Sequence, residues 1–220
     1  MSIELKKRIL TSIFLIVLLF VMYNYSFVMI ISLIIIGIIT WVEFYALISK
    51  IFVKNTIKSK FLKFSFKASS LLYLSLLIFF IIVIDSYYIN LKIYFVYSLL
   101  VAILSDIGGI AFGKFFKGKK LTKISPNKTI SGSIGSFVLP FLLIPFFQSE
   151  LIRYENSTII MITIFISLTT QLGDLFISYL KRKAKVKHTS NILPGHGGFL
   201  DRIDGIIFAI PAGILLFNFT

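Results

Sequence analysis

The sequence predicts an all-α, polytopic integral membrane protein, and three features of the chain indicate this fold class. Hydrophobic residues make up 57% of the 220 residues and charged residues only 15%, which is more apolar surface than a soluble domain of this length needs. The apolar residues form recurring runs of roughly helix-spanning length. The basic residues gather in alternate loops between those runs. The sequence also contains no cysteine, which excludes disulfides and thiolate metal sites.

Seven apolar runs are candidate transmembrane helices of a single membrane domain, residues 1–220. The first run follows Lys6, Lys7 and Arg8 and so resembles the start of a signal peptide. No small-residue cleavage site closes it, and we interpret it as a retained span. Several runs are shorter than the ~20 residues of an upright span, so we expect them to be tilted or partly buried. The expected spans are 9–24, 26–48, 68–84, 93–113, 130–147, 157–180 and 204–219.

The distribution of basic residues predicts the orientation of the chain. Of the 23 Lys and Arg residues, all but Lys92 and Arg153 precede the first span or lie in the loops 49–67, 114–129 and 181–203. Because short cytoplasmic loops are enriched in Lys and Arg, the N-terminus is expected in the cytoplasm and the C-terminus outside. Topology and contact with anionic lipid headgroups then explain the net charge of +14. We therefore expect membrane lipids, and no nucleic acid, as partners.

Five of the nine acidic residues fall inside an expected span or at its cytosolic end. An ionisable group there is costly, so a function is the first hypothesis for each of them. Glu43, beside Trp41, is the exception, because we interpret it as a carboxylate paired to a nearby lysine. The other four are Asp106, Asp174, Asp201 and Asp204.

Asp174 belongs to a polar stripe in the sixth expected span. Gln171, Asp174, Ser178 and Lys181 are spaced i, i+3, i+7 and i+10, so a helix presents them on one face. A lone polar residue in a span often serves only to hold helices together. A carboxylate with cations further along the same face is a more specific indication of a site.

The glycine-rich segment 194–205 contains the next two acids. Its Pro and glycines allow tight turns and let a ligand approach the main chain. We expect Asp201 and Asp204 to point the same way at the start of the seventh helix, where free N–H groups would suit phosphate oxygens. Carboxylates beside phosphate require a bridging cation, and oxygen ligands suit Mg²⁺. His196 either donates a hydrogen bond to a phosphate or stabilises the turn.

A third polar patch surrounds Asp106 and the point near Ser125 where the chain re-enters the membrane. Gly109 and Gly113 have GxxxG spacing, which close helix packing explains and which permits a homodimer. The patch has two readings. Its side chains either hold phosphates with hydroxyls and a point charge or form a capping turn. These side chains are Ser125, Lys128 and Thr129.

Taken together, these residues resemble the signature of the phosphatidate cytidylyltransferases, the CDP-diacylglycerol synthase family. The resemblance covers about residues 105–205, and the first half of the chain is similar to the family only as apolar spans. The block from Leu193 to Asp204 is its most specific part. The other matching segments are Ile124–Pro126 with Lys128, Thr129 and Gly132, then Gln171–Asp174, Ser178–Arg182 and Lys187.

The resemblance implies an enzyme that transfers CMP from CTP to phosphatidate, giving CDP-diacylglycerol and pyrophosphate. It implies N-terminal spans in 1–100 and catalytic spans and cytosolic loops in 101–220, in a multi-pass protein of the inner (plasma) membrane. The active site is then expected on the cytosolic face. Asp174 and Asp201 are the implied ligands of Mg²⁺, with room for a second cation. The implied catalytic residues are Asp174, Asp201, Asp204, Lys181 and Arg202. The implied substrate-binding residues are Ser125, Lys128, Thr129, Ser178, Arg182, Lys187, His196, Gly197 and Gly198.

Three positions depart from the family's usual pattern. His188 stands where the family usually has Asp, Asn127 where it has a second Lys, and Ser131 where it has Glu. These departures leave open a non-catalytic family member. A related enzyme acting on another lipid phosphate is a further alternative. A membrane transporter is the alternative from another class, because intramembrane carboxylates and broken helices are also typical of transporters.

Overall fold

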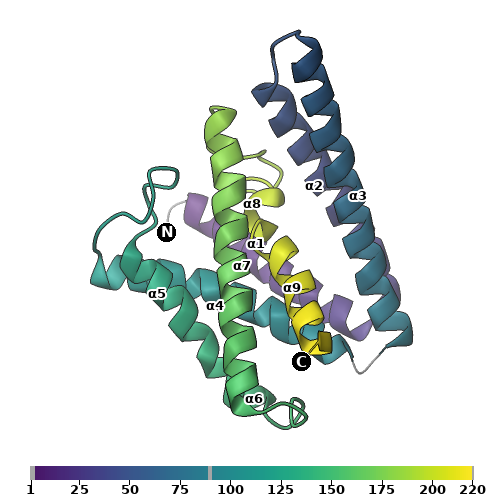
Figure 1. The fold of residues 1–220 in the computed structure, drawn as a ribbon, viewed down its shortest axis with the longest axis vertical. Coiled ribbons are helices and arrows are strands. Elements are labelled where there is room, and N and C mark those ends of the chain that lie inside the picture. The colour runs from purple at the N-terminus through teal and green to yellow at the C-terminus, as the bar shows by residue number, and fades with distance from the viewer. Residues whose placement is uncertain (1–2, 89–90, 220) are drawn as a thin grey trace. The chain divides into compact units, whose positions relative to one another are not determined.

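The computed structural model describes residues 3–88 and 91–219, with side chains from residue 6 onward. Figure 1 shows that the described chain is helical. The described residues form no sheet and contain only two isolated bridges, Lys120 with Thr129 and Leu193 with Gly197. The all-α prediction is confirmed. The helices are α1 (Ile3–Asn24), α2 (Ser26–Ile51), α3 (Ile57–Tyr87), α4 (Lys92–Phe116), α5 (Ile130–Val138), the 3₁₀ helix η2 (Leu139–Leu143), α6 (Ile144–Phe147), α7 (Asn156–Lys183), α8 (Leu200–Ile203) and α9 (Ile206–Phe219).

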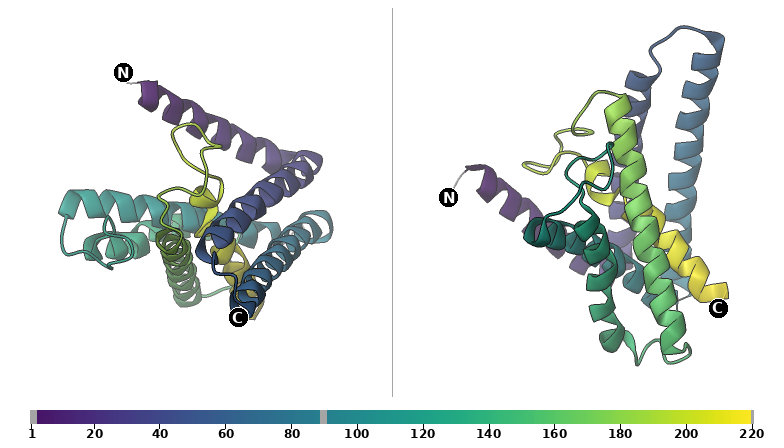
Figure 2. Two further views of the ribbon diagram at one scale, coloured as in Figure 1. Left: turned by 90° about the horizontal axis from the view of Figure 1, so that it is seen from above. Right: turned by 60° about the vertical axis from the view of Figure 1, so that its left-hand side comes forward.

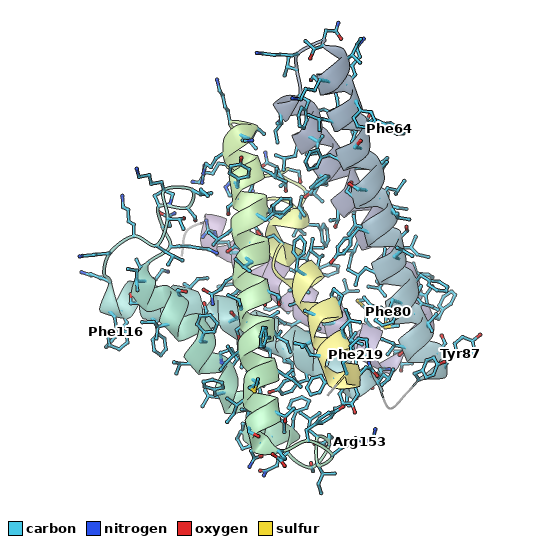
Figure 3. The ribbon with its side chains drawn as sticks, viewed as in Figure 1. Phe64, Phe80, Tyr87, Phe116, Arg153 and Phe219 are labelled. Carbon is cyan, nitrogen blue, oxygen red and sulfur yellow. The ribbon has the colours of Figure 1, made fainter. Side chains whose placement is uncertain are left out.

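Six segments within the described residues are long and apolar enough to cross a membrane, so the chain is a multi-pass membrane protein. Many large apolar side chains on them are exposed, as lipid contact requires; Phe64 and Tyr87 on α3 are 70% and 80% exposed (Figure 3). The seventh expected span corresponds to α9. Its 14 residues rise about 21 Å, less than the ~30 Å of a bilayer's hydrocarbon core.

The largest difference from the expected helix boundaries is at the start of α3. We expected residues 49–67 to be a loop, but α3 already begins at Ile57 and carries Lys58, Lys60, Lys63 and Lys67. Lysine is a good helix former, so a basic segment next to an apolar run can extend the helix rather than end it. The charge pattern marked the expected edge of the membrane and not the edge of the helix.

The described chain divides into two compact units, each with its own packing. The first comprises residues up to 87 together with 180–203, and so contains α1 to α3, the end of α7 and α8. In it α2 and α3 run side by side (Figure 2). The Trp41 indole N–H donates to the Lys67 carbonyl at 3.2 Å, and the Lys67 ammonium lies 3.1 Å from the centroid of the Tyr45 ring. These contacts join the two helices where both carry polar groups.

The second unit comprises residues 88–179 and 204–220 and holds the larger aromatic core. Tyr97 and Thr163 are fully buried, and their hydroxyls are hydrogen-bonded at 2.6 Å. Phe217 of α9 stacks on Tyr94 of α4, with ring centroids 4.6 Å apart. This core ties α4, α7 and α9 together and supports the polar residues of α7.

Glycines let α4 and α5 of the second unit pack backbone to backbone. A Cβ at Gly108 would collide with the Gly135 carbonyl oxygen, and a Cβ at Gly132 would lie 2.6 Å from the Gly109 carbonyl oxygen. A Cβ at Gly113 would lie 3.0 Å from the Thr129 hydroxyl oxygen and would be in ordinary contact, at 3.6 Å, with the Gly132 Cα. The GxxxG spacing therefore serves close helix packing within the chain, as predicted from the sequence.

Candidate active site

In the first unit, polar contacts converge on Asp201, whose side chain is 4% exposed. Its Oδ1 accepts a hydrogen bond from the Lys181 ammonium at 2.7 Å. Its Oδ2 accepts the backbone N–H groups of Thr189 at 2.9 Å and of Gly198 at 3.1 Å. Burial alone would raise the pKa of the Asp201 carboxyl, but the Lys181 charge and these hydrogen bonds outweigh it and hold the pKa below its usual value. The carboxyl is thus kept ionised.

Glu43 of α2 also contacts Thr189 and is 2% exposed. Its Oε1 accepts from the Ser190 hydroxyl at 2.6 Å and the Phe199 N–H at 3.0 Å. Its Oε2 accepts from the Thr189 hydroxyl at 2.7 Å and the Leu200 N–H at 2.9 Å. The interpretation of Glu43 as a lysine-paired carboxylate is wrong for the described residues. Neutral donors of a distant loop satisfy it instead, and the spacing in sequence gave no signal of that loop's approach.

These contacts also revise the expected start of the seventh helix. Asp201 lies in the short helix α8, whereas Asp204 lies in a two-residue turn before α9, so the two acids do not share one helix. Gly205 enables this turn, since a Cβ there would lie 2.6 Å from the Thr170 methyl carbon. The N–H groups of Phe199 and Leu200, at the start of α8, donate to Glu43 and so are not free for phosphate.

The glycine-rich loop before α8 is closed by its own backbone and by Arg202. Gly195 and Gly197 have φ values of +75° and +86°, a region that side chains resist. The Leu193 carbonyl accepts the N–H groups of His196 and Gly197 at 2.9 and 3.1 Å. The Arg202 guanidinium donates to the His196 carbonyl at 3.1 and 2.9 Å. Arg202 thus shapes the loop as well as carrying charge.

Two histidines border this loop and differ in their surroundings. The Nδ1 of His196 is buried and has no hydrogen-bond partner among the described residues. His188 is 47% exposed at its side chain, and its Nδ1 lies 3.7 Å from Oδ2 of Asp201. The position that departs from the family's pattern therefore lies next to a central carboxylate.

In the second unit, Asp174 of α7 is paired with a lysine, as Asp201 is in the first unit. Lys128 forms an ion pair with its Oδ2, and the Ser178 hydroxyl donates to its Oδ1 at 3.2 Å. The two side chains of the ion pair are 26% and 22% exposed. One turn earlier, the Gln171 amide oxygen accepts from the Ser133 hydroxyl at 2.6 Å, which links α7 to α5. The polar stripe of α7 is thus engaged with residues of the third patch.

Ser125 and Thr129 of that patch have local structural roles. The Thr129 hydroxyl accepts the Gly132 N–H at 3.1 Å and caps α5, as residues of this type do at helix N-termini. The Ser125 carbonyl accepts the Lys128 N–H at 3.0 Å in the preceding turn. The capping interpretation holds for Thr129, and the turn presents Lys128 to Asp174.

The remaining predicted residues lie around these two centres. Asp204 is 6% exposed and accepts the Gly205 N–H at 3.1 Å. Arg182, in the last turn of α7, and Lys187, just after that helix, are both exposed. Asp174 and Asp201, the predicted metal pair, belong to different compact units, so they are described separately. Their joint role stays a prediction.

The oxygen atoms of the Asp174 and Asp201 carboxylates are of the ligand type that Mg²⁺ prefers. Each carboxylate oxygen has two lone-pair sites. Among the described residues, Ser178 and Lys128 contact the Asp174 carboxylate, so lone-pair sites remain on this partly exposed side chain. Asp201 has a site left on Oδ1 beside Lys181. No group of three His, Cys, Asp or Glu side chains suited to a metal stands together within the described chain. Mg²⁺ commonly takes only one or two carboxylates, with water and phosphate oxygens completing its shell.

These features define a multi-pass α-helical membrane protein with two lysine-paired carboxylates, one of them buried against a glycine-rich loop. A model of the Cytidylyltransferase family matches residues 2–220, and the chain belongs to this family.

Curated relatives carry the same kind of name. The chain is 42% identical over 120 residues to the phosphatidate cytidylyltransferase of Bacillus subtilis, a match that covers 54% of this chain and 45% of that protein. It is 40% identical over 121 residues to the phosphatidate cytidylyltransferase of Staphylococcus haemolyticus, covering 54% and 46%. The match with the Staphylococcus aureus protein of that name is 41% over 121 residues, with the same coverage. The matched part of the chain thus spans about half the length of these relatives.

Proposed function

We propose that this protein transfers CMP from CTP to phosphatidate, giving CDP-diacylglycerol and pyrophosphate. The observation that carries the proposal is the family match over residues 2–220, joined to relatives named phosphatidate cytidylyltransferase. The two lysine–carboxylate pairs support it, because this reaction brings several negative charges together at one place.

In the proposed reaction, an ionised phosphate oxygen of phosphatidate attacks the α-phosphorus of CTP. The new P–O bond forms as the bond from the α-phosphorus to the bridging oxygen of the β-phosphate breaks, and pyrophosphate leaves with that electron pair. The nucleophile is already an anion, so no strong general base is needed. Positioning and positive charge therefore supply most of the rate enhancement.

The residues divide this work by chemistry. Lys128, Lys181, Arg182, Lys187 and Arg202 would neutralise the triphosphate and the lipid phosphate. His196 would donate to a phosphate oxygen through its unpartnered ring nitrogen. Gly197 and Gly198 would allow close approach to the main chain. Asp174 and Asp201 would hold Mg²⁺, which lowers the charge on the phosphates when bound, and Asp204 would orient that shell. Ser178 would support Asp174 through their hydrogen bond.

The site would face the cytosol of a multi-pass plasma-membrane protein. The charge asymmetry of the loops supports this orientation, and the basic loops would draw both anionic substrates to the surface.

The proposal is tested by assaying purified membranes for conversion of phosphatidate that depends on CTP. Omission of phosphatidate, or its replacement by diacylglycerol, should remove the nucleotide-containing lipid, because diacylglycerol lacks the attacking phosphate. The substitution Asp201→Asn should remove most of the activity. Undiminished activity in Asp201→Asn would refute the metal role of this residue, and a preference for another lipid phosphate would assign the protein to a different reaction of the same class.

A further inference from the structure

Glu43 is a fully desolvated carboxylate on a helix that the proposed mechanism does not use. It comes from α2, a helix long and apolar enough to span a membrane. A buried carboxylate costs several kcal/mol unless hydrogen bonds compensate it. The four donors that compensate Glu43 all belong to residues 189–200, about 150 positions later in the chain. Its contacts therefore fix that loop to α2.

Thr189 connects Glu43 with Asp201. Its hydroxyl donates to Oε2 of Glu43 at 2.7 Å, and its backbone N–H donates to Oδ2 of Asp201 at 2.9 Å. The same hydroxyl oxygen lies 3.2 Å from Oδ2 of Asp201. A hydroxyl has one hydrogen, which serves one carboxylate at a time. The shorter contact assigns it to Glu43, so residue 189 sets the spacing of the two carboxylates.

Gly198 shows how closely Glu43 approaches the loop. A Cβ at Gly198 would lie 2.7 Å from Cδ of Glu43 and would collide with the Thr189 hydroxyl oxygen. The glycine is thus required by the position of the Glu43 carboxylate. The Gly198 N–H donates to Asp201 at 3.1 Å, so the same residue contacts both acids.

We propose that Glu43 is a positioning residue that holds residues 189–200 and, through Thr189 and Gly198, fixes the orientation of Asp201. This inference rests on the proposed function for its kinetic consequence. Its structural consequence, a loop anchored by one carboxylate, is independent of any activity.

The geometry explains why only a carboxylate serves at position 43. Each of its two oxygens accepts one hydroxyl and one backbone N–H. A glutamine would place its NH₂ group against the N–H of either Phe199 or Leu200, whichever way the amide is turned. Glu43→Gln therefore loses acceptors and gains a donor–donor conflict at nearly unchanged volume. Glu43→Asp keeps the acceptors on a shorter side chain and should restore part of the function.

The absence of cysteine from the native chain allows a clean test of loop position. Leu193, in the loop, is 6% exposed, and Ala102, in α4, is fully buried. Single cysteines at these positions, Leu193→Cys and Ala102→Cys, report loop release and general unfolding through maleimide labelling in detergent. Each is combined with Glu43→Gln, with Glu43→Asp, and with Ser49→Ala as the matched control. The Ser49 hydroxyl is exposed on the same helix and, among the described residues, donates only to the Tyr45 carbonyl.

With Glu43→Gln, we expect the labelling rate of Leu193→Cys to rise by about tenfold or more. This factor corresponds to the stability that is lost when one hydrogen bond to a charged group is removed. Labelling of Ala102→Cys should stay unchanged. With Glu43→Asp the increase should be smaller, and Ser49→Ala should have no effect. Protection of Leu193→Cys that is equal with and without Glu43→Gln would overturn the inference. Faster labelling of Ala102→Cys as well would assign Glu43 a general role in stability and would also overturn it.

The kinetic readout separates positioning from substrate binding. In the CTP assay, Glu43→Gln should lower kcat by about tenfold or more with a smaller change in KM for CTP, and Glu43→Asp should recover part of kcat. If Glu43→Gln releases the loop in the labelling experiment but leaves kcat unchanged, Glu43 does not fix the orientation of Asp201. If the native protein converts no phosphatidate, the proposed function fails, whereas the labelling result still decides whether Glu43 anchors the loop.

Discussion

The ammonium of Lys181 lies 2.7 Å from Oδ1 of Asp201, and their side chains are only 11% and 4% exposed. Removing one partner of a buried ion pair strongly destabilises the folded protein, because the other charge stays buried without compensation. Lys181→Met should therefore lower the free energy of unfolding by about 3 kcal/mol, measured as a shift in the thermal unfolding of the detergent-solubilised protein. Lys183→Met, an exposed position in the same helix, should change it by less than about 0.5 kcal/mol. Equal effects would contradict a buried pair.

Asp174 provides a second test, because its ion pair with Lys128 belongs to the other compact unit. Asp174→Asn keeps the shape and removes the charge, so the CTP-dependent rate should fall by about 100-fold. Glu150→Gln makes the same charge change in an exposed residue that is hydrogen-bonded to Ser149, and its rate should match the native protein. Comparable losses in both variants would mean that overall charge, and not Asp174, sets the rate.

The close packing of α4 on α5 predicts that Gly135 tolerates no side chain. A Cβ at Gly135 would collide with the Phe112 side chain and lie 2.7 Å from the Gly108 carbonyl oxygen. Gly135→Ala should cost about 1–3 kcal/mol of stability through overpacking, seen as a lower unfolding temperature in detergent. Gly37→Ala meets only the end of the flexible Ile78 side chain, so its shift should be smaller. A larger shift for Gly37→Ala would contradict the described packing.

His188 tests the departure from the family's pattern. Its Nδ1 lies 3.7 Å from Oδ2 of Asp201, so His188→Asp adds a carboxylate near an existing one. Like charges repel unless a cation lies between them. We expect His188→Asp to preserve or raise activity in Mg²⁺ and to lower stability when Mg²⁺ is chelated. Rates and unfolding temperatures across a Mg²⁺ titration measure both effects. Complete loss of activity in His188→Asp would show that His188 has its own function here.

Much of the fold could be predicted from the sequence because lipid contact imposes long apolar runs. The boundaries of α2 and α4 follow those runs closely, since their ends are marked by polar residues. The start of α3 could not be predicted in this way, because lysines extend a helix as readily as they mark a membrane edge. The break between α8 and α9 depends on how closely Gly205 approaches Thr170, a contact that has no local signature.

The site was predictable where its partners lie near one another in sequence. Asp174 and Ser178 are one helical turn apart, and Asp201 follows the glycine-rich loop that binds it. Glu43 was misjudged because its partners stand far away in the sequence. A buried acid in an otherwise apolar helix indicated that a partner must exist. Only the structure identifies that partner as a set of neutral donors in the loop, rather than as a lysine.

The position of the label from CTP tests the central claim most directly. Native protein in membranes is given phosphatidate and CTP labelled either at the α- or at the γ-phosphate, with Mg²⁺ or with a chelator. The account predicts that α-label enters the lipid in Mg²⁺ and that γ-label appears in pyrophosphate. Label in the lipid from the γ-phosphate would contradict attack at the α-phosphorus. No labelled lipid from folded protein would contradict the proposed reaction, and an equal rate in the chelator would contradict the role of Mg²⁺.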